Sequence, residues 1–107
     1  MAQSTKALTL QDLRSRRSEI LDAASRFGAH NVRIFGSVAR GDATPESDVD
    51  ILVDIDVDAI IGGFAYFGLV ADLRRALSVV VGQDVDVIDS AGLRRLRERV
   101  NREAISL

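Results

Sequence analysis

Two aspartates at the start of an apolar segment are the residues of this sequence best suited to chemistry. Asp48 and Asp50 flank Val49 and lead directly into Ile51-Leu52-Val53. Side chains along a strand alternate between its two faces, so the two carboxylates should project from the same side. At a separation of about 4 Å and an effective dielectric constant of about 20, two such charges repel by about 4 kcal/mol. Because a divalent cation offsets this repulsion, the pair predicts a metal site, and Mg²⁺ suits a few carboxylates together with phosphate oxygens.

A third carboxylate is available on the next predicted strand. Asp84 and Asp86 alternate with valines, so they share one face of that segment. Asp86 lies deeper in the apolar run, and we expect it beside Asp48 and Asp50. Asp84 lies nearer the start of the strand, where a solvated carboxylate on a polar outer face is the simpler interpretation.

A Gly-Ser pair precedes the first two aspartates. Gly36 and Ser37 follow a predicted strand over residues 32–35. Glycine lets the backbone approach a ligand closely, and N–H groups with a serine hydroxyl at a strand-to-helix junction can cradle phosphate. Most Gly-Ser pairs are only turns, so the value of this one lies in its spacing, with ten residues between Ser37 and Asp48.

The scaffold predicted for these residues alternates helices and strands. Thr9 and Asp12 resemble a capping box, and Gly28 is placed to end the first helix. The apolar periodicity predicts helices over about 9–27, 64–77 and 91–103, a helical turn at 38–40, and strands over 32–35, 49–53 and 84–88. This order is typical of an α/β (α+β) fold in which helices cover a small sheet.

Composition sets the limits of the interpretation. With 107 residues, 47% hydrophobic and 28% charged, the chain should form one folded domain over 9–107 after a flexible N-terminus at 1–8. The absence of cysteine excludes disulfides, thiolate catalysis and cysteine-bound zinc, and the single histidine, His30, excludes a multi-histidine metal cage. No apolar run approaches the roughly 18 residues of a membrane span, and no signal-peptide core is present. We therefore expect a cytoplasmic protein that does not cross a membrane.

Three further groups of side chains admit a plain structural interpretation. Three acids continue the alternation past the second strand, and we expect them to be solvent-exposed where the chain leaves that strand: Asp54, Asp56 and Asp58. The arginines near the end are expected to form a solvated helix face, and the pI of about 5.3 argues against nucleic acid as a direct ligand: Arg94, Arg95, Arg97, Arg99 and Arg102. The aromatic residues after the glycines at 62 and 63 belong to the core by default, although they could line an adenine pocket or a partner surface: Phe64, Tyr66 and Phe67.

The spacing between the Gly-Ser pair and the aspartates resembles the signature of a known protein family. Gly36-Ser37, ten residues and then Asp48-Val49-Asp50 resemble the signature of the DNA polymerase β-like nucleotidyltransferase superfamily. The chain is similar to minimal nucleotidyltransferase (MNT) domains, above all to MntA-type antitoxins that are paired with HEPN-domain toxins. The resemblance runs from about Val32 to the end of the chain and rests on four strings: Phe35-Gly36-Ser37-Val38-Ala39-Arg40-Gly41-Asp42, Glu46-Ser47-Asp48-Val49-Asp50-Ile51-Leu52-Val53, Gly82-Gln83-Asp84-Val85-Asp86-Val87-Ile88, and Glu98-Arg99-Val100-Asn101-Arg102-Glu103-Ala104-Ile105.

The resemblance implies a fold and a set of roles. The fold would be the minimal nucleotidyltransferase core, a short mixed sheet of about three strands flanked by helices. Asp48 and Asp50 would bind two Mg²⁺ ions, and Asp86 would ligate the ion that activates the acceptor hydroxyl. Gly36 and Ser37 would hold the β- and γ-phosphates of ATP, with pyrophosphate as the leaving group.

The resemblance also implies an acceptor on a partner. It would be a tyrosine hydroxyl of a HEPN ribonuclease toxin, inactivated by transfer of AMP. Arg40 would either touch phosphate or pair with an acid of the following loop. Two alternatives remain open: a non-catalytic antitoxin that neutralises its partner by binding, and a nucleotidyltransferase with a small-molecule acceptor.

Overall fold

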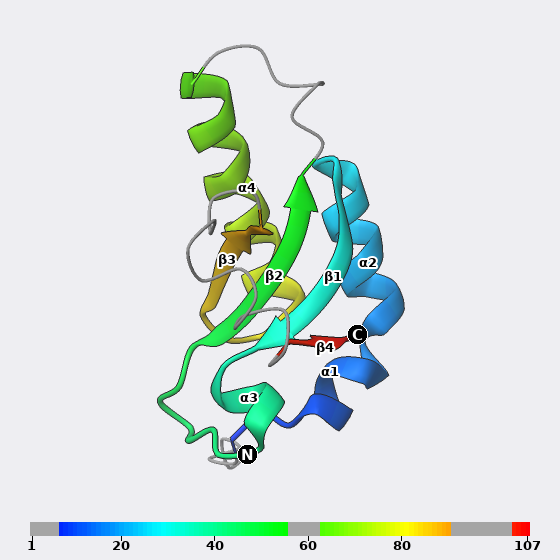
Figure 1. Cartoon of the computed structure of the whole chain (residues 1–107), viewed down its shortest axis with the longest axis vertical. Coiled ribbons are helices and arrows are strands. Elements are labelled where there is room, and N and C mark those ends of the chain that lie inside the picture. Colours follow the sequence, from blue (N-terminus) through cyan, green and yellow to red (C-terminus); the bar gives the residue numbers. More distant parts are fainter. Residues whose placement is uncertain (1–6, 56–62, 91–103) are drawn as a thin grey trace.

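Four helices and four strands follow one another along the described parts of the chain (Figure 1). The computed structural model describes residues 7–55, 63–90 and 104–107. The elements are α1 (Leu10–Ser15), α2 (Arg17–Arg26), β1 (Ala29–Phe35), α3 (Ser37–Arg40), β2 (Val49–Ile55), α4 (Gly63–Val81), β3 (Val85–Asp89) and β4 (Ile105–Ser106). Their order confirms the predicted mixture of helices and a small sheet.

The strands form one mixed sheet in the order β3-β2-β1-β4. β1 pairs antiparallel with both β2 and β4, whereas β2 and β3 run parallel. The three predicted strands are all present, and β4 extends the expected three-stranded sheet to four. β4 comprises only Ile105 and Ser106, which pair with Ile34 and Arg33, so it is too short to show an alternating pattern in the sequence. The helix expected over 91–103 lies outside the described residues.

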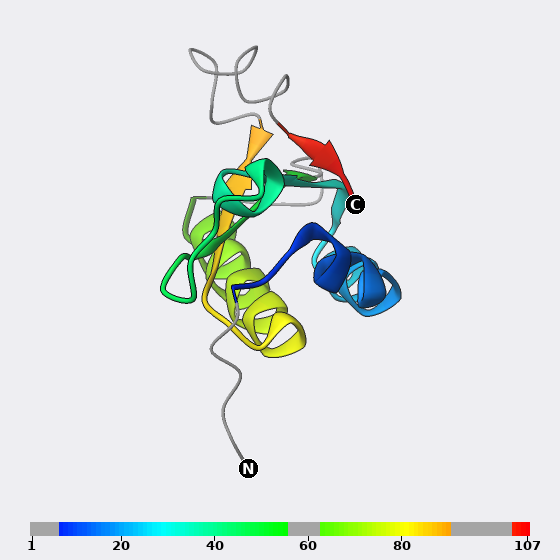
Figure 2. The same ribbon diagram turned by 90° about the horizontal axis from the view of Figure 1, so that it is seen from below.

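Helices α2 and α4 cover one face of this sheet, as the view from below shows (Figure 2). Every second residue of β2, namely Val49, Ile51 and Val53, is buried beneath them. Asp50 and Asp54 alternate with these residues, so they belong to the opposite face. The helix-covered face therefore supplies the core, and the other face holds Asp50 and Asp54 on either side of the fully buried Leu52.

The predicted first helix is interrupted at Arg16, which separates α1 from α2. The capping box is confirmed: the Thr9 N–H donates to Asp12 Oδ2 at 2.9 Å, and the Asp12 N–H donates to Thr9 Oγ1 at 3.1 Å. Gly28 follows α2 with a φ of 73°, as expected for the residue after a helix end. The interruption lets the Arg16 guanidinium donate to the carbonyl oxygens of Val80 (3.2 Å) and Val81 (2.5 Å) at the end of α4. This contact joins segments 64 residues apart, which no local pattern encodes.

The limits of the domain stay a prediction, since residues 1–6 lie outside the described part, although Leu8 packs against the core. None of the helices among the described residues is long and apolar enough to cross a membrane.

Candidate active site

The parallel pairing of β2 with β3 brings two of the predicted carboxylates together. Asp50 of β2 and Asp86 of β3 are partners in the register, and Phe35 of β1 pairs with Asp50 from the other side. Paired residues of adjacent strands project from the same face, so Asp50 and Asp86 are neighbours on the face away from α2 and α4. Asp50 is half-buried between its neighbouring strands, and Asp86, on the edge strand, is exposed.

Asp48 is the last loop residue before β2, two positions ahead of Asp50, and it is exposed. The loop that presents it is fixed by hydrogen bonds: the Thr44 N–H donates to Ser47 Oγ at 2.9 Å, and the Ser47 N–H donates to the Thr44 carbonyl at 3.0 Å. The amide of Gln83 also donates to the Ser47 carbonyl. Gln83 is a positioning residue that sequence reasoning missed, and its place directly before the acidic strand β3 was the available signal.

Charge repulsion marks this group of acids. The pKa of Asp50 is raised, first by burial and then by the negative charges of Asp86 and Asp48, while the positive charge of Arg40 acts in the opposite direction. Burial and the negative charges of Asp86 and Asp48 therefore all favour the protonated form of Asp50.

The Asp50 side chain leaves no room for a side chain at residue 36, so glycine is needed there. Its φ of 80° and ψ of −147° fall in a region that residues with side chains avoid. A Cβ atom built on Gly36 would overlap Oδ2 of Asp50, so the carboxylate already occupies the space beside this glycine. The sequence suggested a glycine that admits a ligand, and the structure shows one that admits a side chain of the same site. Ser37 follows directly, half-buried, as the first residue of α3.

Arg40 ends α3 close to the acids. Its Nε donates to Oδ2 of Asp42 at 3.2 Å, with 52% and 62% of the two side chains exposed. This contact corresponds to the predicted pairing with a loop acid. An ion pair so exposed is weak, and the Arg40 side chain can leave it at little cost. Its effect on the pKa of Asp50 places its charge near the carboxylates as well.

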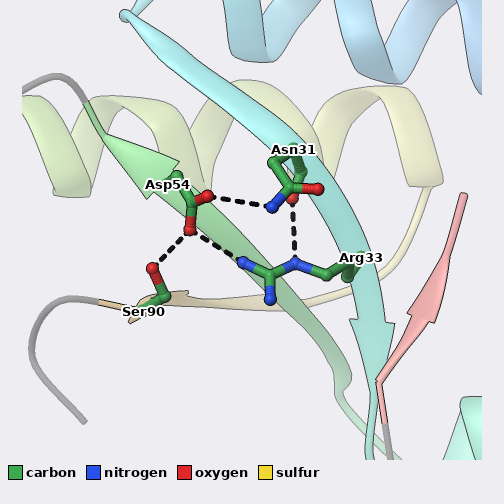
Figure 3. Close-up of polar contacts among 4 residues, drawn as sticks. All are labelled: Asn31, Arg33, Asp54 and Ser90. Atoms are coloured by element: carbon green, nitrogen blue, oxygen red, sulfur yellow. Dashed lines mark hydrogen bonds and ion pairs between the residues drawn. The ribbon is translucent and has the colours of Figure 1, made fainter. Parts of the chain in front are cut away.

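The far end of the same face holds a second polar group (Figure 3). Oδ1 of Asp54 accepts hydrogen bonds from Arg33 Nη2 at 2.8 Å and from the Ser90 hydroxyl, and its Oδ2 accepts from Asn31 Nδ2 at 2.9 Å. Burial by itself would raise the pKa of Asp54, but the hydrogen bonds from Ser90 and Asn31 and the positive charge of Arg33 outweigh it and lower that pKa. The expectation of a solvent-exposed residue is wrong for Asp54 because β1 and β3 supply it with partners; Asp56 and Asp58 lie outside the described residues. The overlooked signal was Arg33, a charged residue between two buried ones in β1.

Known proteins resemble this chain in sequence and in fold. The sequence profile described as a nucleotidyltransferase domain matches residues 17–105. The chain belongs to the nucleotidyltransferase domain family. It is 33% identical over 104 residues to the protein adenylyltransferase MntA of Thermococcus cleftensis, covering 92% of this chain and 95% of that one. It also superimposes with a TM-score of 0.77 on a solved structure described as a minimal nucleotidyltransferase, at 42% identity over 94% of this chain and 97% of the other. A nucleotidyltransferase structure from Sulfolobus solfataricus, at 22% identity and a TM-score of 0.51, over 92% of this chain and 87% of the other, shares the fold.

The carboxylates of this nucleotidyltransferase fit the metal chemistry of the family. Nucleotidyltransferases generally use a nucleoside triphosphate and a divalent metal, and Asp48, Asp50 and Asp86 offer the oxygen ligands that hard cations prefer. The pKa of Asp50 is raised first by burial and then by the charges of Asp86 and Asp48, and a bound cation would favour its ionised form. Among the residues that the structure describes, no group of three or more acids or histidines lies close enough together to hold a metal ion by itself. The donor set therefore fits a cation in charge and chemistry.

An open groove of about 540 Å³ lies between α4 and β3 of the nucleotidyltransferase domain. Its lining includes Phe67, Val70, Ala71, Arg74, Arg75, Ser78, Asp84, Asp86 and Val87. Phe67 is 73% exposed, so the default expectation that it packs in the core is wrong. The side chains of Phe64 and Tyr66 lie outside the described residues. Asp84 is exposed, as expected, and its carbonyl accepts the Val49 N–H that begins the β2–β3 ladder.

Proposed function

We propose that this nucleotidyltransferase is an Mg²⁺-dependent protein adenylyltransferase that transfers AMP from ATP to a tyrosine hydroxyl of a HEPN ribonuclease toxin, and so acts as its antitoxin. The observation that carries the proposal is the pairing of Asp50 with Asp86 across β2 and β3, next to Asp48. It is supported by the relative named protein adenylyltransferase MntA, which matches along nearly the whole of both chains. A cytoplasmic location follows from the proposed ATP and ribonuclease partners.

Each residue of the site has a part in this reaction. Asp48 and Asp50 would hold two Mg²⁺ ions, with Asp86 as a further ligand to one of them. Bound Mg²⁺ would neutralise charge on the phosphates and lower the pKa of the acceptor hydroxyl. Gly36 and Ser37 would hold the β- and γ-phosphates through the backbone and the hydroxyl.

The bond changes are those of a single displacement at phosphorus. The phenol oxygen of the tyrosine forms a bond to the α-phosphorus of ATP, and its proton passes to solvent. The bond from the α-phosphorus to the bridging oxygen breaks, and pyrophosphate leaves with that electron pair. Arg40, whose pair with Asp42 is exposed, can turn to the phosphates and stabilise their charge during this step.

The test is AMP transfer by a variant without the first two carboxylates. The chain is co-expressed with the HEPN-domain protein of its own genome, and the intact mass of that partner is measured. We expect a gain of AMP with the wild type and at least an approximately hundred-fold loss with the double variant Asp48→Asn/Asp50→Asn. The control, Glu19→Gln/Asp22→Asn, removes two charges from exposed positions of α2 and should transfer normally. Full transfer by Asp48→Asn/Asp50→Asn would refute the site.

The second candidate function is neutralisation of the toxin by binding alone. The observation in its favour is that, over the described ranges, the carboxylates are not yet arranged as a complete metal site. A partner that is inhibited but unmodified, and equally inhibited by Asp48→Asn/Asp50→Asn, would establish this function instead.

A further inference from the structure

Side chains of α4 bind the outer edge of β3 at Val85. The Val85 N–H donates to Ser78 Oγ at 3.1 Å, and the Val85 carbonyl accepts from Arg74 Nε at 2.9 Å. The backbone groups of Val85 therefore point away from β2. Because this direction alternates along a strand, the N–H and carbonyl of Val87 point the same way. Within residues 7–55, 63–90 and 104–107, β3 is the last strand on this side of the sheet.

The groove between α4 and β3 is lined on the strand side by Asp84, Asp86 and Val87. Figure 1 shows α4 and β3 themselves, one beside the other. Its helix wall is a stripe at helical spacing that begins with Phe67, Val70 and Ala71. Phe67 is 73% exposed and Ala71 is exposed, so this end of the wall offers apolar surface. The strand wall contains Asp86 and Val87. Asp86, where the proposed reaction delivers the acceptor hydroxyl, therefore lies on the open face of the sheet and also lines the groove at the sheet's edge.

We propose that this groove binds an extended segment of the acceptor protein as an added strand on the edge of β3, with its tyrosine hydroxyl at Asp86. The inference rests on the proposed function and names the surface that recognises the substrate. Strand addition to an open edge gains main-chain hydrogen bonds, here from Val87, and side-chain contacts on the apolar wall. The tyrosine arrives from the side of Asp86, while Gly36 and Ser37 lie on the β1 side of Asp50 and remain free for the phosphates of ATP.

A protein segment suits this groove better than a nucleic acid. Asp84, which is exposed on the strand wall and has no part in the proposed metal site, repels phosphate groups. On the helix wall, Arg75 lies 3.7 Å from Asp72, and the two side chains are 78% and 59% exposed, so this ion pair is weak and easily exchanged. An acidic residue beside the acceptor tyrosine can replace Asp72 as the partner of Arg75. The predicted substrate is therefore an extended tyrosine segment with neighbouring acidic residues.

The first test fills the groove without touching the carboxylates. Ala71→Arg places a long charged side chain on the helix wall, and Val79→Arg, at an 80% exposed position of the same helix that does not line the groove, is the matched control. The acceptor probe is the HEPN-domain protein of the same genome. We expect Ala71→Arg to lower kcat/KM for AMP transfer at least ten-fold and to weaken binding of the acceptor. Binding of Mn²⁺ and ATP should stay unchanged in both variants.

The second test addresses charge. Arg75→Glu should lower kcat/KM about three- to ten-fold through a higher KM for the acceptor. Its control is Arg26→Glu, which breaks an equally exposed helix ion pair with Asp22, at 3.0 Å, away from the groove. No loss with Arg75→Glu would refute the acidic character of the segment.

The outcomes separate this inference from the proposed function. If the wild type transfers AMP and Ala71→Arg does so at the same rate with the same affinity for the acceptor, the groove is not the docking site. If the wild type transfers no AMP, the proposed function fails, and the affinity of the acceptor for wild type and Ala71→Arg still decides the groove. One further result would overturn the inference. In that result, the wild type binds single-stranded RNA, Ala71→Arg abolishes this binding, and both proteins bind the acceptor with the same affinity.

Discussion

At the scale of single residues, the site depends on how closely the Asp50 carboxylate approaches Gly36. The position beside the glycine Cα is filled by Oδ2 of Asp50, and the glycine backbone has a positive φ. A side chain at residue 36 would displace the half-buried carboxylate from its place beside Asp86. Gly41 also has a positive φ, of 83°, but a Cβ there would meet nothing within 4 Å.

This difference predicts the effect of two matched substitutions. Gly41→Ala should cost about 1 kcal/mol in the free energy of unfolding, because of its backbone conformation alone. Gly36→Ala should cost about 2–4 kcal/mol and should also abolish Mn²⁺ binding, since it adds overlap with Asp50 to a more restricted conformation. Urea unfolding and metal titration measure both quantities. Equal behaviour of the two variants would show that Asp50 does not depend on Gly36.

Burial of Asp50, together with repulsion from Asp86 and Asp48, predicts that ionised Asp50 destabilises the metal-free fold. A raised pKa means that the folded state favours protonated Asp50, so stability is lost as pH rises through that pKa. Asp50→Asn should therefore be more stable than the wild type at pH 7 without metal, and the difference should shrink as the pH falls toward 4. Urea unfolding across this pH range measures it, with Asp72→Asn as a control for loss of an exposed carboxylate. A less stable Asp50→Asn at pH 7 would contradict the assigned repulsion.

At the scale of elements, β2 joins two polar sites on one face of the sheet. Asp50 lies near its start, and Asp54 near its end connects it to Arg33 of β1 and to Ser90 after β3 (Figure 3). The Arg33 side chain is only 13% exposed, and its Nη2 lies 2.8 Å from Oδ1 of Asp54. The Asp54 group therefore connects the strands that carry Asp50 and Asp86.

Loss of Asp54 should cost stability in a pH-dependent way. Asp54→Ala leaves Arg33 without its carboxylate and should cost about 1–3 kcal/mol at pH 7. Since the pKa of Asp54 is lowered in the fold, its contribution is present above the ordinary carboxyl pKa and is lost as the pH falls through the folded value. The gap between wild type and Asp54→Ala should thus close at acidic pH in urea unfolding. Asp22→Ala, which breaks an exposed ion pair, should cost about 0.5 kcal/mol or less; a similar value for Asp54→Ala would contradict the account.

Local patterns predicted much of this architecture. The alternation of apolar and acidic residues predicted which face of its strand carries Asp50 and which carries Asp86. Residue types also predicted the N-cap of the first helix at Thr9 and the helix end at Gly28. The parallel register that pairs Asp50 with Asp86 was not readable, because apolar strands of similar composition can slip against one another. The division of the first helix at Arg16 was also hidden, since it depends on carbonyl groups of α4 that are distant in the sequence. The partners of Asp54 were missed for the same reason.

At the scale of the whole molecule, the two faces of the sheet and the outer edge of β3 differ in what they carry. α2 and α4 bury the apolar side of the sheet, which leaves the other side for carboxylates at half-buried and exposed positions. We propose that the outer edge of β3 gives the acceptor a route to Asp86. On this proposal, stability comes from the helix-covered face, while catalysis and substrate recognition use surfaces whose change leaves the core intact.

The most direct test of the account is cation binding in the presence of ATP, measured from the free Mn²⁺ signal by electron paramagnetic resonance. The wild type and Asp84→Asn, which changes an exposed carboxylate on the same groove wall, should bind Mn²⁺ and ATP alike. Asp50→Asn and Asp86→Asn should each weaken Mn²⁺ binding at least about ten-fold, because both carboxylates hold the same cation pair. Wild-type binding by Asp86→Asn would contradict the central claim that carboxylates of β2 and β3 form one metal site.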